Sequence, residues 1–198
     1  MSKIPADLHK KCETGVIRAK DAIAQGYHPM NLKRLEQKGL LVHSGWGIYT
    51  PISANITEHH GLVEATQRVP KGVICLLSAL SFHELTTQIP FETWLAIAPN
   101  ARHPKDKLLS LRILHMSGEA LQSGIESHEI EGVTVRIYCL AKTIVDCFKY
   151  RNKIGLDVAI EALRECLRAK CCTVDELWHY AKICRMSNVM RPYLEAIA

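Results

Sequence analysis

The amino-acid sequence of 198 residues predicts an α+β fold divided into two domains, residues 1–52 and residues 53–198. Three observations support this prediction. Residues 16–51 contain two short helical segments followed by two strand-like segments, and glycines separate them. Residues 124–138 alternate between apolar and polar side chains with a period of two, as in a β-hairpin. From residue 140 onward the apolar side chains recur at helical spacing, which predicts several C-terminal helices beside a small β-sheet.

The first helix of the N-terminal domain has an apolar side and a glycine at its end. Gly26 follows it, and glycine readily takes the positive φ found after many helix C-termini. Pro29 then begins a second helix, where its missing N–H costs nothing because first-turn N–H groups have no partner within the helix. The apolar side of the first helix consists of Val16, Ile17, Ala22, Ile23 and Ala24.

The second helix carries long polar and cationic side chains opposite a narrow apolar side. Leu32 and Leu35 lie on the inner side, and Gly39 ends the helix. At about 100° per residue the outer side comprises Met30, Lys33, Arg34 and Gln37, with Asn31 and Lys38 at its edges. Residues 40–42 and 48–49 then form strands around a glycine-rich tip. This order of helix, turn, basic helix and hairpin is typical of a winged helix-turn-helix, whose second helix enters the major groove of DNA.

A simpler interpretation of this region is a helical hairpin and a β-hairpin with a solvated charged face. The distribution of charge favours nucleic-acid binding instead. Residues 1–54 contain eight Lys and Arg against four Asp and Glu, whereas the rest of the chain contains 17 basic against 16 acidic residues. Four of the five net positive charges therefore lie in the first quarter of the chain, as expected of a surface that contacts phosphates.

Composition favours a cytoplasmic globular protein without a membrane span, metal or cofactor. Hydrophobic residues make up 47% of the chain, but no run of about 18 apolar residues occurs. The N-terminal segment MSKIPADLHKKCE lacks the apolar stretch of a secretory signal, so the eight cysteines are expected to be reduced thiols. Cys166, Cys171, Cys172 and Cys184 cluster with His179 near the C-terminus. Several of these cysteines fall on apolar helix faces, where free cysteine packs as a small hydrophobic residue.

The second domain is predicted to be a small mixed sheet with several helices. Before the hairpin of residues 124–138 we expect helices over 58–69 and 74–85, strands over 91–98 and 109–116, and a polar loop over 100–107. After it we expect helices over 140–150, 156–167 and 173–184 and a last helix that ends near residue 197, with residues 151–153 as a break. Thr173 and Glu176 have the spacing of a capping box, which marks a helix N-terminus.

The second domain lacks the common catalytic motifs: a nucleophile elbow, a phosphate-binding glycine loop and a paired-histidine zinc motif. Asp146 is notable because it falls within the apolar run of residues 143–148, and a buried carboxylate needs a partner. We expect Arg136, Lys142 or Arg151 to supply that partner. A structural salt bridge is the first interpretation of Asp146. The alternative is a catalytic acid in an enzyme that acts on nucleic acid or nucleotides and uses the N-terminal domain for targeting.

A series of short motifs extends over nearly the full chain. They are Gly47-x-Tyr49, Pro70-x-Gly72-Val73-Ile74-x4-Ala79-Leu80, His83-x-Leu85-Thr86, Val135-x-Ile137-Tyr138, Ala141-Lys142-Thr143-Ile144-Val145-Asp146, Tyr180-Ala181 and Tyr193-Leu194-Glu195-Ala196. In order and spacing they resemble the AbiEi family of antitoxins. The resemblance implies that the N-terminal domain binds double-stranded operator DNA at inverted repeats and represses the operon that encodes antitoxin and toxin. It also implies that the C-terminal domain counteracts the toxin, a nucleotidyltransferase, either by direct contact or through a shared target.

On this interpretation the protein is a transcriptional repressor and antitoxin, not an enzyme, and its DNA contacts lie in and around the second helix. The expected major-groove residues are Lys33, Arg34 and Gln37, and the expected phosphate contacts are Arg18, Asn31 and Lys38. The hairpin tip lacks the arginine that such wings often carry, so His43 and Trp46 are the candidates for a wing contact. Trp46 packed against the second domain is an equal alternative. A third hypothesis is a purely protein-binding module.

Overall fold

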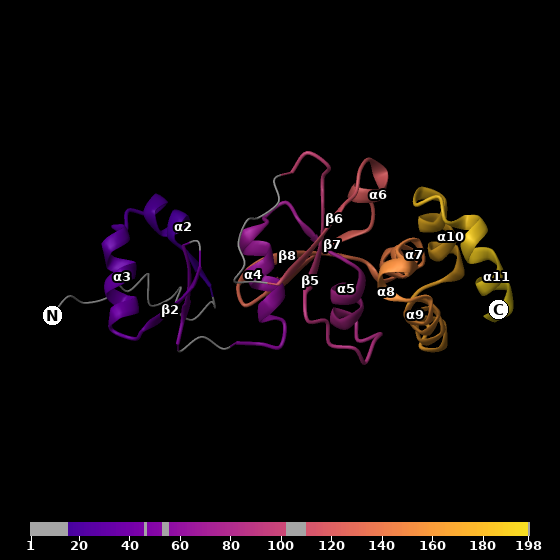
Figure 1. Cartoon of the computed structure of the whole chain (residues 1–198), viewed down its shortest axis with the longest axis horizontal. Coiled ribbons are helices and arrows are strands. Elements are labelled where there is room, and N and C mark those ends of the chain that lie inside the picture. Colours follow the sequence, from indigo (N-terminus) through magenta and orange to yellow (C-terminus); the bar gives the residue numbers. More distant parts are fainter. Residues whose placement is uncertain (1–15, 46, 53–55, 102–109, 198) are drawn as a thin grey trace. The chain divides into compact units, whose positions relative to one another are not determined.

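The computed structural model describes residues 16–45, 47–52, 56–101 and 110–197 (Figure 1). In this part of the chain helices and strands are interspersed, and the strands form two separate sheets. This arrangement confirms the predicted α+β class. The described residues divide into two compact units. The first unit comprises residues 16–70, 110 and 128–135, and the second comprises residues 71–101, 111–127 and 136–197. No helix among the described residues is long and apolar enough to cross a membrane.

The first unit contains a three-stranded antiparallel sheet with strand order β1-β3-β2. Its elements are β1 (Ile17–Arg18), α2 (Ala19–Ala24), α3 (Pro29–Gln37), β2 (Leu41–Gly45), β3 (Ile48–Pro51) and α4 (His60–Arg68). The assignment of residues 16 and 17 to the first helix is wrong, because Ile17 pairs with Tyr49 and Arg18 pairs with Ile48. The β-branched side chains of Val16 and Ile17 favour an extended backbone, and the exposed edge of β3 supplies its hydrogen bonds.

One hydrophobic cluster of the first unit packs α2 and α3 against the sheet. It contains Ile17, Ala22, Leu32, Leu35 and Leu41, with Tyr27 and Tyr49 packed against it. Leu62, Val63 and Ala65 of α4 are also buried in this unit. The inner side predicted for the second helix is therefore confirmed, because Leu32 and Leu35 are both buried. Whether this arrangement of helices and hairpin is a winged helix-turn-helix stays a prediction, as does the domain boundary after residue 52.

The two glycines that separate the elements of the first unit have the positive φ that the sequence predicts. At the end of α2, Gly26 has a φ of +87°, and the N–H of Tyr27 donates to the carbonyl of Ala22 at 3.1 Å. At the end of α3, Gly39 has a φ of +67°, and the N–H of Leu40 donates to the carbonyl of Leu35 at 2.9 Å. Both helix ends thus have the 6→1 hydrogen bond of a Schellman motif.

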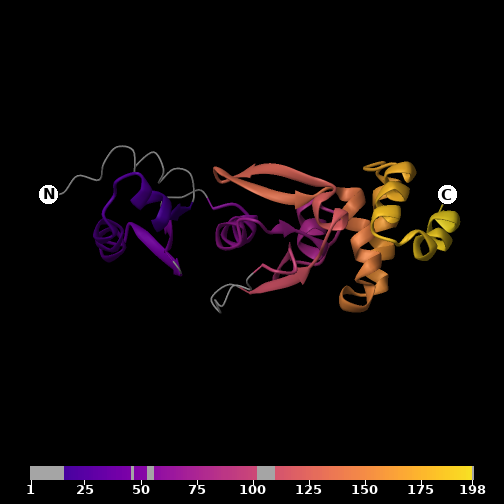
Figure 2. The same ribbon diagram turned by 90° about the horizontal axis from the view of Figure 1, so that it is seen from above.

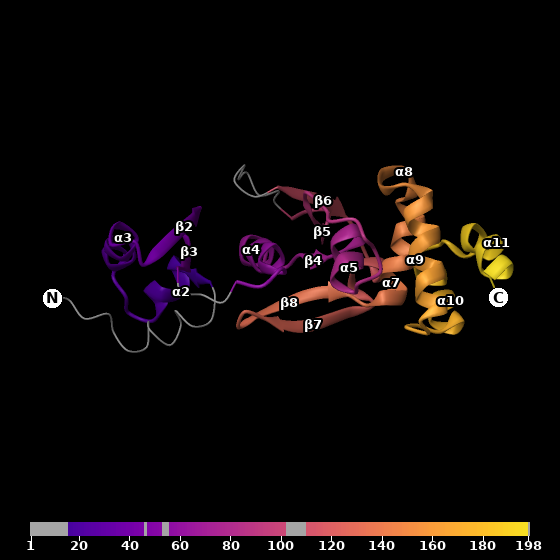
Figure 3. The ribbon, with the colours of Figure 1, turned by 90° about the horizontal axis from the view of Figure 1, so that it is seen from below.

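The second sheet has five strands in the order β6-β5-β4-β8-β7. Strands β4 and β5 are antiparallel, whereas β4 with β8 and β5 with β6 are parallel. The strands are β4 (Val73–Ile74), β5 (Thr93–Ile97), β6 (Leu111–His115), β7 (Ile125–Ile130) and β8 (Val133–Tyr138). Strands β7 and β8 lie side by side as the predicted hairpin, which Figure 3 shows clearly.

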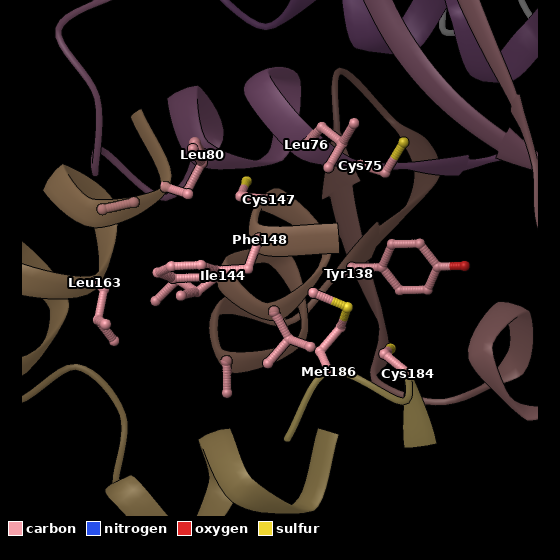
Figure 4. Packing of buried hydrophobic residues seen from close by; sticks show 14 of the residues in the cluster. Cys75, Leu76, Leu80, Tyr138, Ile144, Cys147, Phe148, Leu163, Cys184 and Met186 are labelled. Atoms are coloured by element: carbon pink, nitrogen blue, oxygen red, sulfur yellow. The ribbon is translucent and has the colours of Figure 1, made fainter. Parts of the chain in front are cut away.

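The helices of this region are α5 (Leu76–Phe82), α6 (Glu119–Gln122), α7 (Leu140–Lys149), α8 (Arg151–Ile154), α9 (Leu156–Arg168), α10 (Val174–Ile183) and α11 (Ser187–Ile197). The last five, orange to yellow in Figure 2, gather at one end of the sheet. Helix α7 is their centre and contacts α5, α9, α10 and α11. Figure 4 shows Ile144, Cys147 and Phe148 of this helix among residues of other elements, including Leu80 and Leu163.

Two predictions for the second unit are wrong. The single helix expected over residues 74–85 is the strand β4 followed by the shorter α5. Ile74 pairs with both Leu95 and Ile137, so β4 is an inner strand, and its continuous apolar sequence is indistinguishable from a buried helix. The expected break at residues 151–153 is the short helix α8, and the chain instead breaks at Gly155, whose φ is +97°. The predicted loop over residues 100–107 lies mostly outside the described residues.

Candidate nucleic-acid interface

Local sequence fixes both ends of α3. Pro29 is its first residue, and the Nδ1 atom of His28 accepts a hydrogen bond from the N–H of Met30 at 3.2 Å. His28 is therefore the N-cap, a role that the sequence analysis did not identify because Ser, Thr, Asp and Asn are the usual caps. Together with the Schellman motif at Gly39, this cap gives α3 a defined start and end.

The outer side of α3 and its C-cap, Lys38, carry five of the eight predicted contact residues. Asn31, Lys33, Arg34, Gln37 and Lys38 are all exposed. On the opposite side Leu32 is only 1% exposed and Leu35 9% exposed, whereas Met30 on the outer side is 53% exposed. Among the described residues, Lys33, Arg34 and Lys38 take part in no salt bridge. The cations of this helix are thus positioned by its buried leucines and remain available to a ligand.

Arg18 lies on a different element from the other predicted contacts. It is the second residue of β1, pairs with Ile48 of β3, and is half-buried. The structure therefore places Arg18 in the sheet of the first unit, and its predicted contact with phosphate stays a prediction.

The hairpin β2–β3 is held in part by His43. The His43 ring stacks on the Tyr49 ring with a centroid separation of 4.7 Å, and its Nε2 atom accepts a hydrogen bond from the N–H of Gly47 at 3.3 Å. Gly47 has a φ of +73°, and its carbonyl accepts a hydrogen bond from the N–H of Ala19 at 2.6 Å. His43 is exposed but helps to shape the tip, and Trp46 lies outside the described residues.

The second unit encloses a buried polar centre. The Lys142 ammonium donates to Oδ2 of Asp146, and neither side chain is exposed to solvent at all. The thiol of Cys184 donates to the other oxygen, Oδ1, at 3.5 Å, and the Lys142 nitrogen lies 4.2 Å from the centre of the Tyr138 ring. The prediction that a basic residue pairs with Asp146 is confirmed, and that residue is Lys142.

The other two candidate partners of Asp146 have different roles. Arg136 donates to the carbonyl of Lys71 at 3.3 Å, and Arg151 donates to the carbonyl of Phe148 at 2.9 Å. Asp146, Lys142 and Arg136 therefore do not converge on one accessible site. This geometry favours the structural interpretation of Asp146 over the catalytic one.

The electrostatics of the polar centre agree with a structural role. Burial raises the pKa of the Asp146 carboxyl, although the charge of Lys142 opposes the shift. Burial and the nearby Asp146 carboxylate raise the pKa of Cys184 to about 11. At neutral pH the Cys184 thiol is therefore protonated, which makes it a poor nucleophile.

A pocket of about 690 Å³ lies next to this centre in the second unit. Its charged lining comprises Glu119, Lys149, Lys182 and Arg185, and Cys184 also faces it. The sequence analysis missed this pocket, because these residues lie up to 66 positions apart and share no motif. Among the described residues, no three His, Cys, Asp or Glu side chains are grouped so that they could hold a metal ion.

Comparison with known proteins shows the fold alone. No protein-family model matches the chain, and no curated protein matches it. Among solved structures, the RV2827C protein from Mycobacterium tuberculosis is similar, with a TM-score of 0.62. The match covers 92% of this chain and 73% of that protein at 12% sequence identity. At this identity the likeness concerns the fold and carries no statement about function.

Proposed function

We propose that this protein is a cytoplasmic, DNA-binding transcriptional repressor that also counteracts a nucleotidyltransferase toxin. One observation carries the DNA-binding part: the exposed cations and amides on the outer side of α3, whose cations make no salt bridge within the part of the chain that the structure describes. A helix with this surface, preceded by a short helix and followed by a hairpin, has the layout of a winged helix-turn-helix. The positive charge of the first quarter of the chain supports the same proposal.

The spacing on α3 suits contact with base edges. Gln37 lies four residues after Lys33 and three after Arg34, so its side chain projects from the same side of the helix as theirs. Arginine and lysine donate to the acceptors of guanine, and glutamine pairs with adenine in the major groove. Asn31 and Lys38 lie at the edges of that side, where the phosphate backbone would pass.

The antitoxin part of the proposal rests on the resemblance to the AbiEi family. The longest uninterrupted motif of that resemblance, residues 141–146, lies on α7 and is entirely buried. Its residues therefore support the fold of the second unit, and we expect any toxin contact on the surface of that unit, not at the motif. The enzyme hypothesis gains nothing from this region, because the Lys142–Asp146 pair is inaccessible and Cys184 is protonated.

A salt series of DNA binding tests the repressor proposal. The full chain is titrated with duplex DNA from upstream of its own gene and, separately, with a scrambled duplex of equal length and composition. We expect tighter binding to the native duplex and an affinity that falls steeply with salt, because counterions are released from the phosphates. Equal, weak and salt-insensitive binding to both duplexes would reject DNA recognition and favour the protein-binding hypothesis.

Variants of α3 locate the interface. Arg34→Ala should weaken binding to the native duplex by about 1–3 kcal/mol and reduce discrimination at one base pair. Lys38→Ala should weaken binding to both duplexes equally and lower the salt slope by about 1. Matched controls are Arg164→Ala and Lys153→Ala, which remove exposed cations of the same type from α9 and α8. If the controls weaken binding as much as the α3 variants do, the interface is assigned to the wrong surface.

Co-expression with the neighbouring gene tests the antitoxin part. We expect the neighbouring product to arrest growth and the full chain to restore it. The double variant Lys33→Ala, Arg34→Ala should lose repression but still restore growth, because its substitutions lie outside the second unit. Continued arrest with the full-length wild type would reject the antitoxin proposal and leave the repressor proposal intact.

A further inference from the structure

The pocket of the second unit has a mostly positive lining. Its volume of about 690 Å³ lies within the range of pockets that hold small-molecule ligands, about 300–1,000 Å³. Its charged lining comprises one carboxylate, from Glu119, and three cations. The cations are Lys149, Lys182 and Arg185. All lining residues belong to the second unit, so this pocket is separate from the proposed DNA interface on α3.

The three cations meet because two helices end at the pocket. Lys149 lies in the last turn of α7, Lys182 lies in the last turn of α10, and Arg185 follows the C-cap of α10. Cations at such positions offset the partial negative charge of the last helix carbonyls, but this effect does not require two helix ends to line one hollow. Within the part of the chain that the structure describes, none of the three cations forms a salt bridge. They are therefore free to bind an anion.

The buried polar centre beside the pocket does not cancel this positive charge. The Asp146 carboxylate accepts a hydrogen bond from the Lys142 ammonium, and the two charges neutralise each other. Cys184, which lines the pocket next to this pair, keeps its proton at neutral pH because burial raises its pKa to about 11. The pocket thus keeps an excess of positive charge.

We propose that this pocket binds a small molecule that carries a chain of phosphates on a sugar, as in a nucleoside triphosphate. Several cations can share the charge of a phosphate chain, and the planar guanidinium of Arg185 can donate two hydrogen bonds to phosphate oxygens. The Glu119 carboxylate can accept hydrogen bonds from sugar hydroxyls. Ala120 and Ile183 add apolar surface to the lining. A single inorganic phosphate would fill only a small part of the pocket volume.

Calorimetric titration of the full-length protein tests the proposal. The protein is titrated without divalent cations at one salt concentration with ATP, ADP, adenosine and tripolyphosphate. We expect affinity to fall from ATP to ADP and to be lost for adenosine, because the cations contact the phosphates. We expect ATP to bind more tightly than tripolyphosphate, because Glu119 repels a bare polyanion and accepts hydrogen bonds from a sugar. Equal affinity for ATP and tripolyphosphate, or no binding of ATP, would overturn the proposal.

Arg185 can be removed without a change in the backbone. Its φ is +59°, and the N–H of Met186 donates to the carbonyl of Ala181 at 2.7 Å, a helix end at which glycine is the usual residue. Arg185→Gly should therefore fold like the wild type and weaken ATP binding by about tenfold or more. Lys170→Gly is the matched control. Lys170 has a φ of +54° after the end of α9, and its exposed side chain does not line the pocket, so this variant should bind ATP like the wild type.

Further comparisons separate the proposed site from general surface charge and from nucleic-acid binding. Glu119→Ala should remove the preference for ATP over tripolyphosphate. Arg185→Gly should bind the upstream DNA duplex with the affinity of the wild type, because the pocket lies outside the first unit. Equal loss of ATP binding in Arg185→Gly and Lys170→Gly would mean that ATP binds to surface charge in general. Loss of duplex binding in Arg185→Gly with unchanged ATP binding would assign the pocket to nucleic acid. Either result would overturn the proposal.

Discussion

Helix α3 of the first unit and helix α7 of the second unit place their charged side chains in opposite ways. In the first unit a cluster of five buried residues supports α3, whose cations are exposed and make no salt bridge with any described residue. In the second unit a much larger core encloses the Lys142–Asp146 ion pair without any exposure. Charge on the outer side of α3 is therefore available for binding and is separate from the fold, whereas the Lys142–Asp146 charges are part of the fold. Substitution should accordingly change binding on the outer side of α3 and stability at the Lys142–Asp146 pair.

Breaking the buried Lys142–Asp146 ion pair should give the largest change in the free energy of unfolding. Asp146→Ala leaves the Lys142 ammonium buried without a partner, which should lower the free energy of unfolding by about 3–5 kcal/mol. Urea denaturation of wild type and variant measures the difference.

A double variant distinguishes the cost of an unpaired buried charge from the contribution of the ion pair itself. Lys142→Met with Asp146→Leu replaces both charges by apolar side chains and should recover most of the lost stability, because buried ion pairs gain little over apolar packing. A single variant that unfolds at the same urea concentration as the wild type would mean that the polar centre is hydrated in solution and that the comparison between units is wrong.

Two neighbouring residues of α3 test the comparison within the first unit. Leu32 is 1% exposed in the cluster that supports α3, and Leu32→Ala should lower the free energy of unfolding by about 2–5 kcal/mol. Lys33→Ala, one position further, should change it by about 0.5 kcal/mol or less while it weakens DNA binding. Hydrogen exchange of the first unit's amides measures the first effect, and thermal unfolding the second. Similar stability losses in both variants would show that the outer side of α3 is covered in solution.

The capping box of α10 should give a smaller effect. The Thr173 hydroxyl accepts a hydrogen bond from the N–H of Glu176 at 3.2 Å, and the Glu176 carboxylate accepts one from the N–H of Thr173 at 2.7 Å. Thr173→Ala should cost about 1 kcal/mol of stability, and Thr173→Ser, which keeps the hydroxyl, should restore it. Denaturant midpoints of the three proteins give the comparison. Loss of stability in Thr173→Ser equal to that in Thr173→Ala would assign the effect to the methyl group.

Local patterns predicted those elements that local chemistry determines. The β7–β8 hairpin, the start of α3 at Pro29 and the capping box at Thr173 follow from turn residues and caps. The cost of an unpaired carboxylate predicted a basic partner for Asp146 but left three candidates open. Local patterns did not predict the strands β1 and β4, because each has two residues and depends on pairing with strands distant in the sequence. The outer side of α3 was predictable from helical periodicity, whereas the pocket beside Cys184 arises from how helices end and meet.

The smallest expected effect comes from a carboxylate in the first unit that, unlike the α3 cations, is paired. Glu131 accepts hydrogen bonds from the N–H and the hydroxyl of Thr57 at 2.8 and 2.9 Å, and its other oxygen lies 2.7 Å from Nδ1 of His60. Burial alone would raise the pKa of Glu131, but these hydrogen bonds outweigh it and leave the pKa lowered.

The stabilisation by the ionised Glu131 should therefore be fully present above the ordinary glutamate pKa of about 4.3 and should be lost as pH falls through the lower value of the folded state. Its size should be about 0.5–1 kcal/mol. The stability difference between wild type and Glu131→Gln, measured by urea denaturation from pH 6 to pH 3, should shrink as pH falls, and a difference that is constant over this range would remove the ionised Glu131 from the account of the first unit.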